Sequence, residues 1–239
     1  MERFLKMEIE KMKSLALWFL AVISSSVLTS HKQTPVKNEQ RILLELVAQN
    51  SQPIDVQQLK KILVDHTADP GSLYHWQNHV VIFDSVQDVS LLKTKLQKAF
   101  PQLLVKMYVD LVYKFDRKVH CNNPVIAREW DQIILTANLV KDAKMQQEYL
   151  DYHATQFKEW PEVANGFCHA DFQQLLVYKN GRQLVLIISI PKGESLDKLN
   201  PRTTENNPRV DQWNELMKKY QEGIAGTKAG EVWVFLKKV

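Results

Sequence analysis

Several residue types on which whole protein classes depend are scarce in this sequence. Its 239 residues include seven glycines and two cysteines. A phosphate-cradling loop needs closely spaced glycines, and no segment of the sequence carries them in that arrangement. Two cysteines cannot supply the disulfide framework of a small secreted scaffold. The sequence therefore argues against a P-loop nucleotide-binding protein and against a disulfide-rich domain.

The sequence also lacks a strong charge of one sign. The net charge is +4, and lysines and arginines are scattered among acidic residues, so nucleic-acid binding is not favoured. Hydrophobic residues make up 45% and charged residues 24% of the chain, which is typical of a globular protein with a core. At roughly 100–200 residues per domain, the length fits one large domain or two small ones.

The apolar run at residues 15–23 is too short for a comfortable membrane span, which needs about 20 residues. Lys13 precedes the run and small polar residues follow it. This pattern is typical of a secretory signal peptide over residues 1–30. We therefore expect an exported protein, periplasmic or secreted, with no stable membrane insertion after signal removal. An uncleaved anchor helix is the alternative, and the translation start, Met1 or Met12, stays open.

The two cysteines, Cys121 and Cys168, lie 47 residues apart and are expected in different domains. Export would permit a disulfide between them, but geometry decides pairing and the sequence does not show it. Separate thiols are the simpler expectation. Each cysteine has a histidine neighbour, His120 or His169, yet the spacing of a four-ligand zinc site is missing. No metal is predicted.

The first half of the chain gives a mixed pattern of helical and strand signals. We interpret residues 31–77 as a linker and helical segment, and residues 78–118 as a strand-helix-strand unit. The expected elements are a polar linker at 31–38, a helix at 42–47, a helix after Asp55, a strand at 79–83, a helix capped by Asp88 and a strand at 104–113.

The second half is better patterned and predicts an α+β fold, a ferredoxin-like β-α-β-β-α-β domain at residues 130–239. Its expected elements are strands at 132–140, 172–178, 182–190 and 231–237, with helices at 141–158, 161–166 and 210–221. Asn180-Gly181 is a strong hairpin signal between the second and third strands. Such a sheet carries helices on one face only, so its other apolar face needs a cover. A second copy, as in dimeric α+β barrels, or residues 78–116 of the same chain could supply it.

Polar aromatic residues follow one face of the helix predicted over residues 141–158. Tyr149 and His153 are four residues apart and therefore lie one turn above the other. Gln156 and Trp160 continue near this stripe. Such a stripe suits a cleft for a polar, ring-shaped ligand. From spacing alone, a partly buried amphipathic stripe is the simpler interpretation.

An ordered set of motifs carries a family resemblance over about residues 132–239. The motifs are the Tyr149-x-x-x-His153 pair, Trp160-Pro161-Glu162, the hairpin, the helix with Trp213 and Met217, and the closing strand at 231–236. This order resembles the L-rhamnose mutarotase family. The resemblance implies that Tyr149 and His153 are active-site residues and that Trp213 is the tryptophan of the last helix. Asn214 stands where the family often has a second tryptophan.

The resemblance implies a sugar mutarotase that interconverts the anomers of L-rhamnose or a similar 6-deoxy sugar. Mutarotation needs one group to take the anomeric hydroxyl proton and another to protonate the ring oxygen. A histidine near pKa 6.5 can do either, and a tyrosine hydroxyl can donate, accept or relay. No metal or cofactor is required. The expected substrate-binding residues are Trp160, Trp213, Gln156, Tyr152 and Asn207.

Other interpretations of the sequence stay open. A non-catalytic carbohydrate-binding or assembly protein could retain the same fold, and a small oxygenase could share it by analogy alone. His75 and His79 form a His-x-x-x-His pair but lack the glutamate of the zinc-protease motif. The polar loop at 203–208 could contact sugar hydroxyls, although helix capping is the simpler role.

Overall fold

The computed structural model describes residues 40–239 apart from residues 50–52 and 67. The signal peptide predicted over residues 1–30, and the linker expected at 31–38, lie outside this described part. Among the helices that are described, none is long and apolar enough to cross a bilayer. The fold is a mixed one of antiparallel strands and several helices, which confirms the predicted α+β class at this level.

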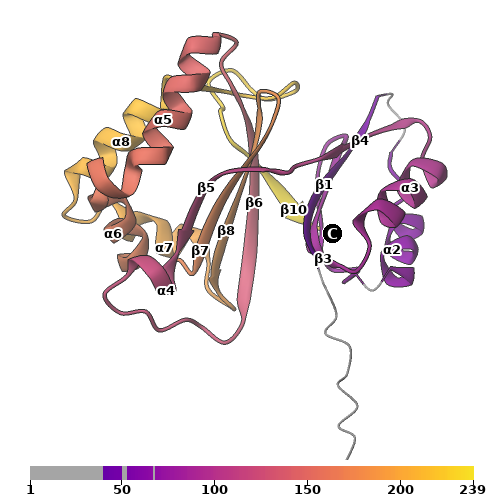
Figure 1. Cartoon of the computed structure of the whole chain (residues 1–239), viewed down its shortest axis with the longest axis horizontal. Helices are drawn as coiled ribbons and strands as arrows, with labels where there is room; N and C mark the ends of the chain where they lie inside the picture. Colours follow the sequence, from indigo (N-terminus) through magenta and orange to yellow (C-terminus); the bar gives the residue numbers. More distant parts are fainter. Residues whose placement is uncertain (1–39, 50–52, 67) are drawn as a thin grey trace, which may run out of the picture. The chain divides into compact units, whose positions relative to one another are not determined.

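The N-terminal half, residues 40–107, contains four strands and two helices (Figure 1). Its elements are β1 (Gln40–Ala48), α2 (Val56–Asp65), β2 (Leu73–Trp76), β3 (His79–Val86), α3 (Val89–Ala99) and β4 (Leu103–Met107). The strand order is β4-β1-β3-β2. Asp55 and Asp88 cap the two helices, accepting hydrogen bonds from the amides of Gln58 and Leu91 at 3.0 and 2.8 Å. The sequence placed both residues at the start of an expected helix.

The helix predicted over residues 42–47 is wrong, because this segment is strand β1. β1 pairs with β3 on one side and with β4 on the other. Leu43 packs on one face, and Ile42, Leu44 and Leu46 pack on the other, so apolar residues fill both faces. A strand covered on both faces has no alternation, and its spacing can imitate a helix.

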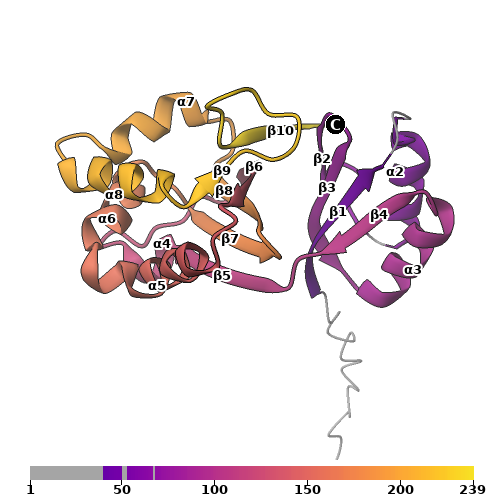
Figure 2. The same ribbon diagram turned by 90° about the horizontal axis from the view of Figure 1, so that it is seen from above.

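The C-terminal half, residues 110–239, contains the remaining elements. They are β5 (Asp110–Asp116), α4 (Arg117–His120), β6 (Trp130–Leu139), α5 (Ala143–Glu159), α6 (Pro161–His169), β7 (Gln174–Asn180), β8 (Gln183–Pro191), α7 (Leu196–Leu199), the 3₁₀ turn η1 (Asn200–Thr203), α8 (Pro208–Lys218), β9 (Gln221–Glu222) and β10 (Val234–Lys238). Its strands follow the order β10-β6-β8-β7-β5, with β9 paired to β6. Helices α5, α6 and α8 cover one face of these strands (Figure 2).

The strand predicted over residues 104–113 divides into β4 and β5, which join different halves. β4 pairs with β1, whereas β5 pairs with β7. Tyr108 and Val109 form the crossing between them, and the Tyr108 amide donates to the Leu43 carbonyl at 2.9 Å. The last strand also starts later than expected, at Val234.

The helix-free faces of the two sheets pack against each other. Leu43, Tyr74, Val81, Phe83 and Tyr108 from the N-terminal half form one buried cluster with Ile134, Leu176, Val185, Ile187 and Leu236 from the C-terminal half. β2 also pairs with β10, with Lys237 opposite His75. The expectation that the preceding segment covers the C-terminal sheet is confirmed. The N-terminal half of the same chain occupies that face, and the homodimer expected through it stays a prediction.

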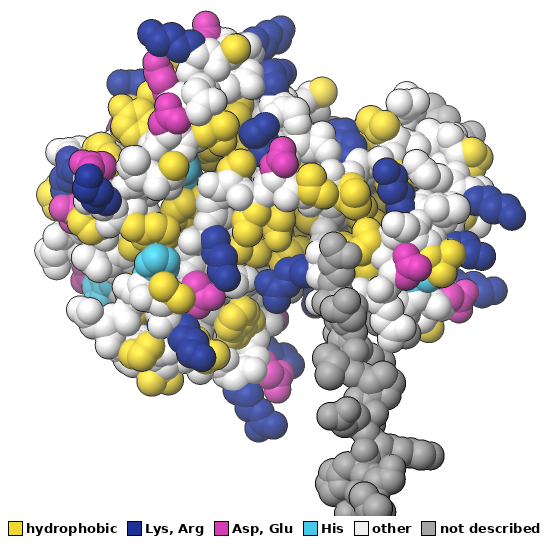
Figure 3. Space-filling model, viewed as in Figure 1, with side chains coloured by type: hydrophobic (Ala, Val, Ile, Leu, Met, Phe, Trp, Pro, Cys, Tyr) yellow, Lys and Arg dark blue, Asp and Glu magenta, His cyan; other side chains and the backbone are white. Residues whose placement is uncertain are grey.

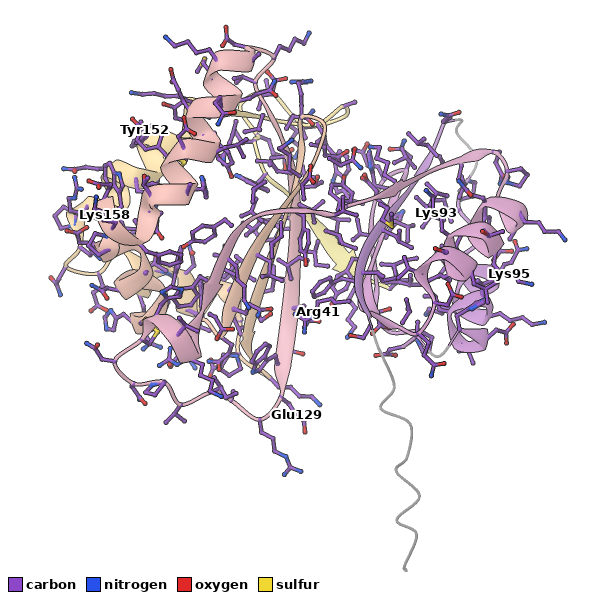
Figure 4. All side chains as sticks on the ribbon, in the orientation of Figure 1. Arg41, Lys93, Lys95, Glu129, Tyr152 and Lys158 are labelled. Atoms are coloured by element: carbon purple, nitrogen blue, oxygen red, sulfur yellow. A yellow bond between two sulfur atoms is a disulfide. The ribbon has the colours of Figure 1, made fainter. Side chains whose placement is uncertain are left out.

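Polar contacts also join the two sheets. Arg41 on β1 donates to Gln174 Oε1 on β7 at 3.1 Å, and it lies between the two halves in Figure 4. Elsewhere, on the face shown in Figure 3, basic side chains are scattered among acidic ones. The charge pattern seen in the sequence is therefore kept on this surface.

The expectation of separate thiols is wrong, because Cys121 and Cys168 form a disulfide. Cys121 follows α4 and Cys168 lies on α6, and the two Cα atoms are 5.6 Å apart. The cysteines belong to one half, since β5 and α4 fold with the C-terminal sheet. The bond also removes the zinc alternative, because neither thiol is available as a ligand.

Candidate functional site

A cavity of about 280 Å³ lies between the sheet and the helices of the C-terminal half. Its apolar side includes Leu175 and Val177 of β7 and Leu186 and Ile188 of β8. The polar side chains and tryptophans that line it are Tyr113, Tyr149, His153, Asn200, Trp213, Asn214, Lys218, Gln221 and Trp233. The volume is close to the lower end of small-ligand pockets, about 300–1,000 Å³.

Helix α5 places Tyr149 and His153 in this cavity. Asp142 fixes the start of the helix by accepting from the Met145 amide at 2.9 Å. The buried residues of the helix are Tyr149, His153 and Gln156, an i, i+4, i+7 stripe that faces the core. The predicted pair is therefore brought together, with ring centroids 4.1 Å apart.

His153 is held in one tautomer by the backbone. Its Nδ1 lies 2.9 Å from the Tyr149 carbonyl oxygen. A carbonyl can only accept, so Nδ1 carries the proton and Nε2 keeps its lone pair. Burial lowers the pKa of His153 to about 4, against a smaller raising effect of the same backbone hydrogen bond. At neutral pH the ring is therefore uncharged, with Nε2 able to accept a proton.

Tyr149 is 1% exposed, and burial raises the pKa of its phenol. A hydrogen bond from the Gln221 side chain acts in the opposite direction. Gln221 Oε1 in turn accepts from the Trp233 indole nitrogen at 3.1 Å. The phenol stays protonated at neutral pH, so it can donate a hydrogen bond to a bound ligand.

Aromatic rings surround His153. Trp213 and Tyr113 each meet the imidazole edge-on, both with centroids 5.2 Å away. Trp213 lies on α8 and is itself supported by Trp160 at 5.6 Å. Aromatic side chains in a cavity can offer apolar faces to a ring-shaped ligand, while polar groups bind its hydroxyls.

Four of the predicted substrate-binding residues do not line this cavity. Gln156 is fully buried, accepting from the Tyr113 hydroxyl at 2.8 Å and donating to the Trp160 carbonyl at 3.0 Å. The Arg209 guanidinium stacks on Trp160, with its Cζ atom 3.9 Å from the centroid of the Trp160 ring. These contacts place Gln156 and Trp160 behind the lining residues.

Tyr152 and Asn207 also lie outside the cavity lining. Tyr152, which Figure 4 labels on α5, contacts the rings of Trp213 and Tyr220. Asn207 precedes α8 and donates to the Glu162 carbonyl at 2.9 Å. It lines a separate polar depression with Glu162 and His169.

The sequence did not single out Tyr113, Gln221 or Trp233 as site residues. Tyr113 and Phe115 alternate on β5 and both face the helices, but β5 was expected in another unit. Trp233 belongs to the closing motif without a role there. Within the described ranges, no group of three or more histidine, cysteine or acidic residues could hold a metal ion.

Comparison with known proteins shows what this half of the chain is similar to. Residues 132–239 match the family model of L-rhamnose mutarotase. The L-fucose mutarotase of Xanthomonas campestris pv. campestris is 28% identical over 97 residues, which cover 40% of this chain and 75% of that protein. A UPF0734 protein of Dictyostelium discoideum is 26% identical over 100 residues, covering 40% and 77%.

The resemblance predicted for residues 132–239 is thereby confirmed, and the class it indicates is the sugar mutarotases, which are isomerase-type enzymes. A solved structure from Fusobacterium nucleatum is described provisionally as a monooxygenase. The structural match to it includes 83% of this chain and 92% of the Fusobacterium chain. Its sequence is 10% identical to this chain, and the TM-score is 0.43.

Proposed function

We propose that this protein is a mutarotase, an aldose 1-epimerase that interconverts the α and β anomers of L-rhamnose or a similar 6-deoxy sugar. The observation that carries the proposal is the pair Tyr149 and His153, which lines one cavity with rings 4.1 Å apart. His153 has a free acceptor nitrogen and Tyr149 a protonated hydroxyl, and these are the two groups that acid-base mutarotation needs.

The cavity's apolar side supports a 6-deoxy sugar. A methyl group on the sugar can lie against Leu175, Val177 and Ile188, whereas a hydroxymethyl group there would lose hydrogen bonds to water. Asn200, Asn214 and Lys218 supply hydrogen-bonding groups to the same cavity. The expected pose places the ring across Trp213, with the anomeric carbon between His153 and Tyr149.

We also infer that the C-terminal half has the ferredoxin-like fold. Its strands β6, β7, β8 and β10 lie in the order β10-β6-β8-β7, and helices separate β6 from β7 and β8 from β10. The N-terminal half has the same arrangement, β4-β1-β3-β2. It therefore takes the position that a second copy holds in a dimeric α+β barrel.

The sugar activity can be tested by saturation-transfer NMR, which detects exchange between anomeric protons directly. We expect exchange on L-rhamnose or L-fucose to increase in proportion to protein concentration. L-Mannose, which differs from L-rhamnose only by a hydroxyl on C6, is the matched control and should exchange more slowly. Sugar binding without exchange on any of the three would favour the non-catalytic carbohydrate-binding alternative.

We further propose that the protein is exported and folds in an oxidising compartment. The apolar run at residues 15–23 and the Cys121–Cys168 disulfide support this independently. Protein isolated without reductant from the medium or periplasm should show no free thiol by mass spectrometry after alkylation. Its N-terminal sequence should start near His31. Intact Met1 or Met12 together with two alkylated thiols would refute the proposal.

A further inference from the structure

Gln221 lines the cavity and is held there by both its backbone and its side chain. It lies in the short strand β9, opposite Leu139 of β6. The neighbouring Tyr220 carbonyl accepts from the Val140 amide at 2.9 Å. Gln221 Oε1 accepts from the indole nitrogen of Trp233 at 3.1 Å. Gln221, Trp233 and Tyr149 all line the same cavity.

The indole contact fixes which way the Gln221 amide points. An indole N–H can only donate, so the atom that it contacts must be the amide oxygen. The NH₂ group of Gln221 is then the group available to the Tyr149 hydroxyl, which lines the same cavity and whose pKa a hydrogen bond from the Gln221 side chain lowers. An NH₂ group can only donate, so the phenol oxygen accepts this bond. The phenol's own proton is therefore free for an acceptor in the cavity.

His153, in contrast, presents a hydrogen-bond acceptor to the cavity. Its Nδ1–H is used by the Tyr149 carbonyl, so Nε2 is an acceptor. Tyr149 thus presents a hydrogen-bond donor to the cavity and His153 an acceptor. The hydrogen bond with Gln221 sets the role of Tyr149, and the hydrogen bond to the Tyr149 carbonyl sets the role of His153.

We propose that Gln221, oriented by Trp233, is a positioning residue that keeps the Tyr149 hydroxyl as the proton donor to the sugar ring oxygen. This inference rests on the proposed mutarotase function and assigns the two roles within it. His153 Nε2 takes the proton of the anomeric hydroxyl, and the C1–O double bond forms. The bond from C1 to the ring oxygen breaks, and its electron pair stays on that oxygen, which takes the Tyr149 proton.

The reverse sequence closes the ring on the other face and returns both protons. In the open-chain state His153 is an imidazolium and Tyr149 is a phenolate, so no net proton is gained or lost. Gln221 donates to the phenolate oxygen at that stage, when the hydrogen bond is strongest. The contribution of Gln221 is therefore expected in kcat rather than in KM.

The test compares three variants in the exchange assay. Gln221→Leu removes both hydrogen bonds, and Trp233→Phe removes only the indole donor. Both should lower kcat by about 10- to 100-fold, the effect of one hydrogen bond to a charged group, with KM within about 3-fold. Gln221→Glu places an ionised carboxylate that can only accept and so draws the phenol proton away from the sugar. It should be slower at pH 7 than Gln221→Leu.

Matched controls separate this role from folding. Gln147→Leu removes an exposed glutamine from α5, and Trp130→Phe removes an indole bonded to the Ala127 carbonyl at 2.9 Å. Both should keep wild-type kcat. Melting temperatures and circular dichroism identify any variant that loses structure.

A double-mutant cycle shows whether Gln221 acts through Tyr149. In a Tyr149→Phe background, Gln221→Leu should change kcat by less than about 2-fold, because the group that it positions is gone. A full 10-fold loss in that background would overturn the inference, as would wild-type kcat in Gln221→Leu. If the wild-type protein exchanges no sugar, the proposed function is refuted and the inference falls with it. If the wild type exchanges sugar and the Gln221 and Trp233 variants keep its kcat, the inference is refuted and the proposed function stands.

Discussion

His153→Ala should reduce anomer exchange at neutral pH by at least about 100-fold, because a positioned acid-base group contributes about 100- to 10,000-fold in rate. The imidazole lies inside the cavity and Nε2 is its only nitrogen free to accept a proton. Exchange of the anomeric protons of L-rhamnose, divided by the folded fraction from circular dichroism, measures the effect. Tyr149→Phe keeps the ring and should also lose rate with little loss of stability.

His169→Ala is the matched control for this prediction. His169 ends α6, has a half-exposed ring near Glu205, and does not line the cavity. Its removal should leave exchange unchanged. The assignment fails if His153→Ala lowers the melting temperature while exchange per folded molecule stays close to that of the wild type, since His153 would then be a structural histidine.

The pH dependence of exchange follows from the same environment. Burial lowers the pKa of His153 to about 4, so the neutral base persists far below the usual histidine range. The rate should stay flat from neutral pH to about pH 5 and then fall as pH drops through about 4, where the ring takes a proton. An ordinary histidine would already lose rate around pH 6.5.

The second half of the fold could be predicted from sequence because its signals are local. Asn180-Gly181 forms the turn between β7 and β8, and Pro161 stands at the start of α6. The N-terminal half could not be predicted in the same way. β1 is defined by its pairing with β3 and β4 rather than by its own pattern. β5 pairs with β7, which follows it in the chain only after β6, α5 and α6.

The same distinction holds for the candidate site. Tyr149 and His153 were found because helical spacing brings them together within one element. Gln221 and its partner Trp233 line the same cavity as Tyr149 only because β9 pairs with β6, and no spacing rule predicts that pairing. Gln156 lies on the same buried face of α5, as predicted, but its side chain accepts a hydrogen bond from Tyr113 of β5. Tertiary partners therefore decide which residues of a helical stripe are left for a ligand.

Tertiary pairing also explains a buried carboxylate that the sequence did not single out. Glu45 of β1 is fully buried between the two halves. One oxygen accepts from His79 Nδ1 at 2.6 Å and Gln183 Nε2 at 2.9 Å, and the other from the Tyr108 hydroxyl at 2.7 Å and Lys106 Nζ at 3.2 Å. Gln183 is the partner from the C-terminal half. The network therefore satisfies the charge and links the two sheets.

Glu45→Gln should destabilise the protein by about 3 kcal/mol at pH 7, because the amide offers one acceptor oxygen instead of two to the surrounding donors and removes the negative charge beside Lys106. Burial alone would raise the pKa of Glu45, but hydrogen bonds from His79 and Tyr108 and the positive charge of Lys106 lower it from 4.5 to about 2. A lowering of this size corresponds to about 3 kcal/mol of stability. Because the folded-state pKa is depressed, this contribution is present above about pH 4.5 and is lost as pH falls toward 2.

Urea unfolding followed by circular dichroism, at several values between pH 7 and pH 2.5, checks both the size and the sign. The difference between wild type and Glu45→Gln should be largest at neutral pH and should shrink as pH falls below about 4.5. Glu129→Gln is the matched control, because Glu129 pairs with Lys192 on the surface with 58% of its side chain exposed. Its cost should be below about 1 kcal/mol. A Glu45→Gln protein within 1 kcal/mol of the wild type at pH 7 would mean that the network adds no net stability, because the desolvation of Glu45 offsets its four hydrogen bonds.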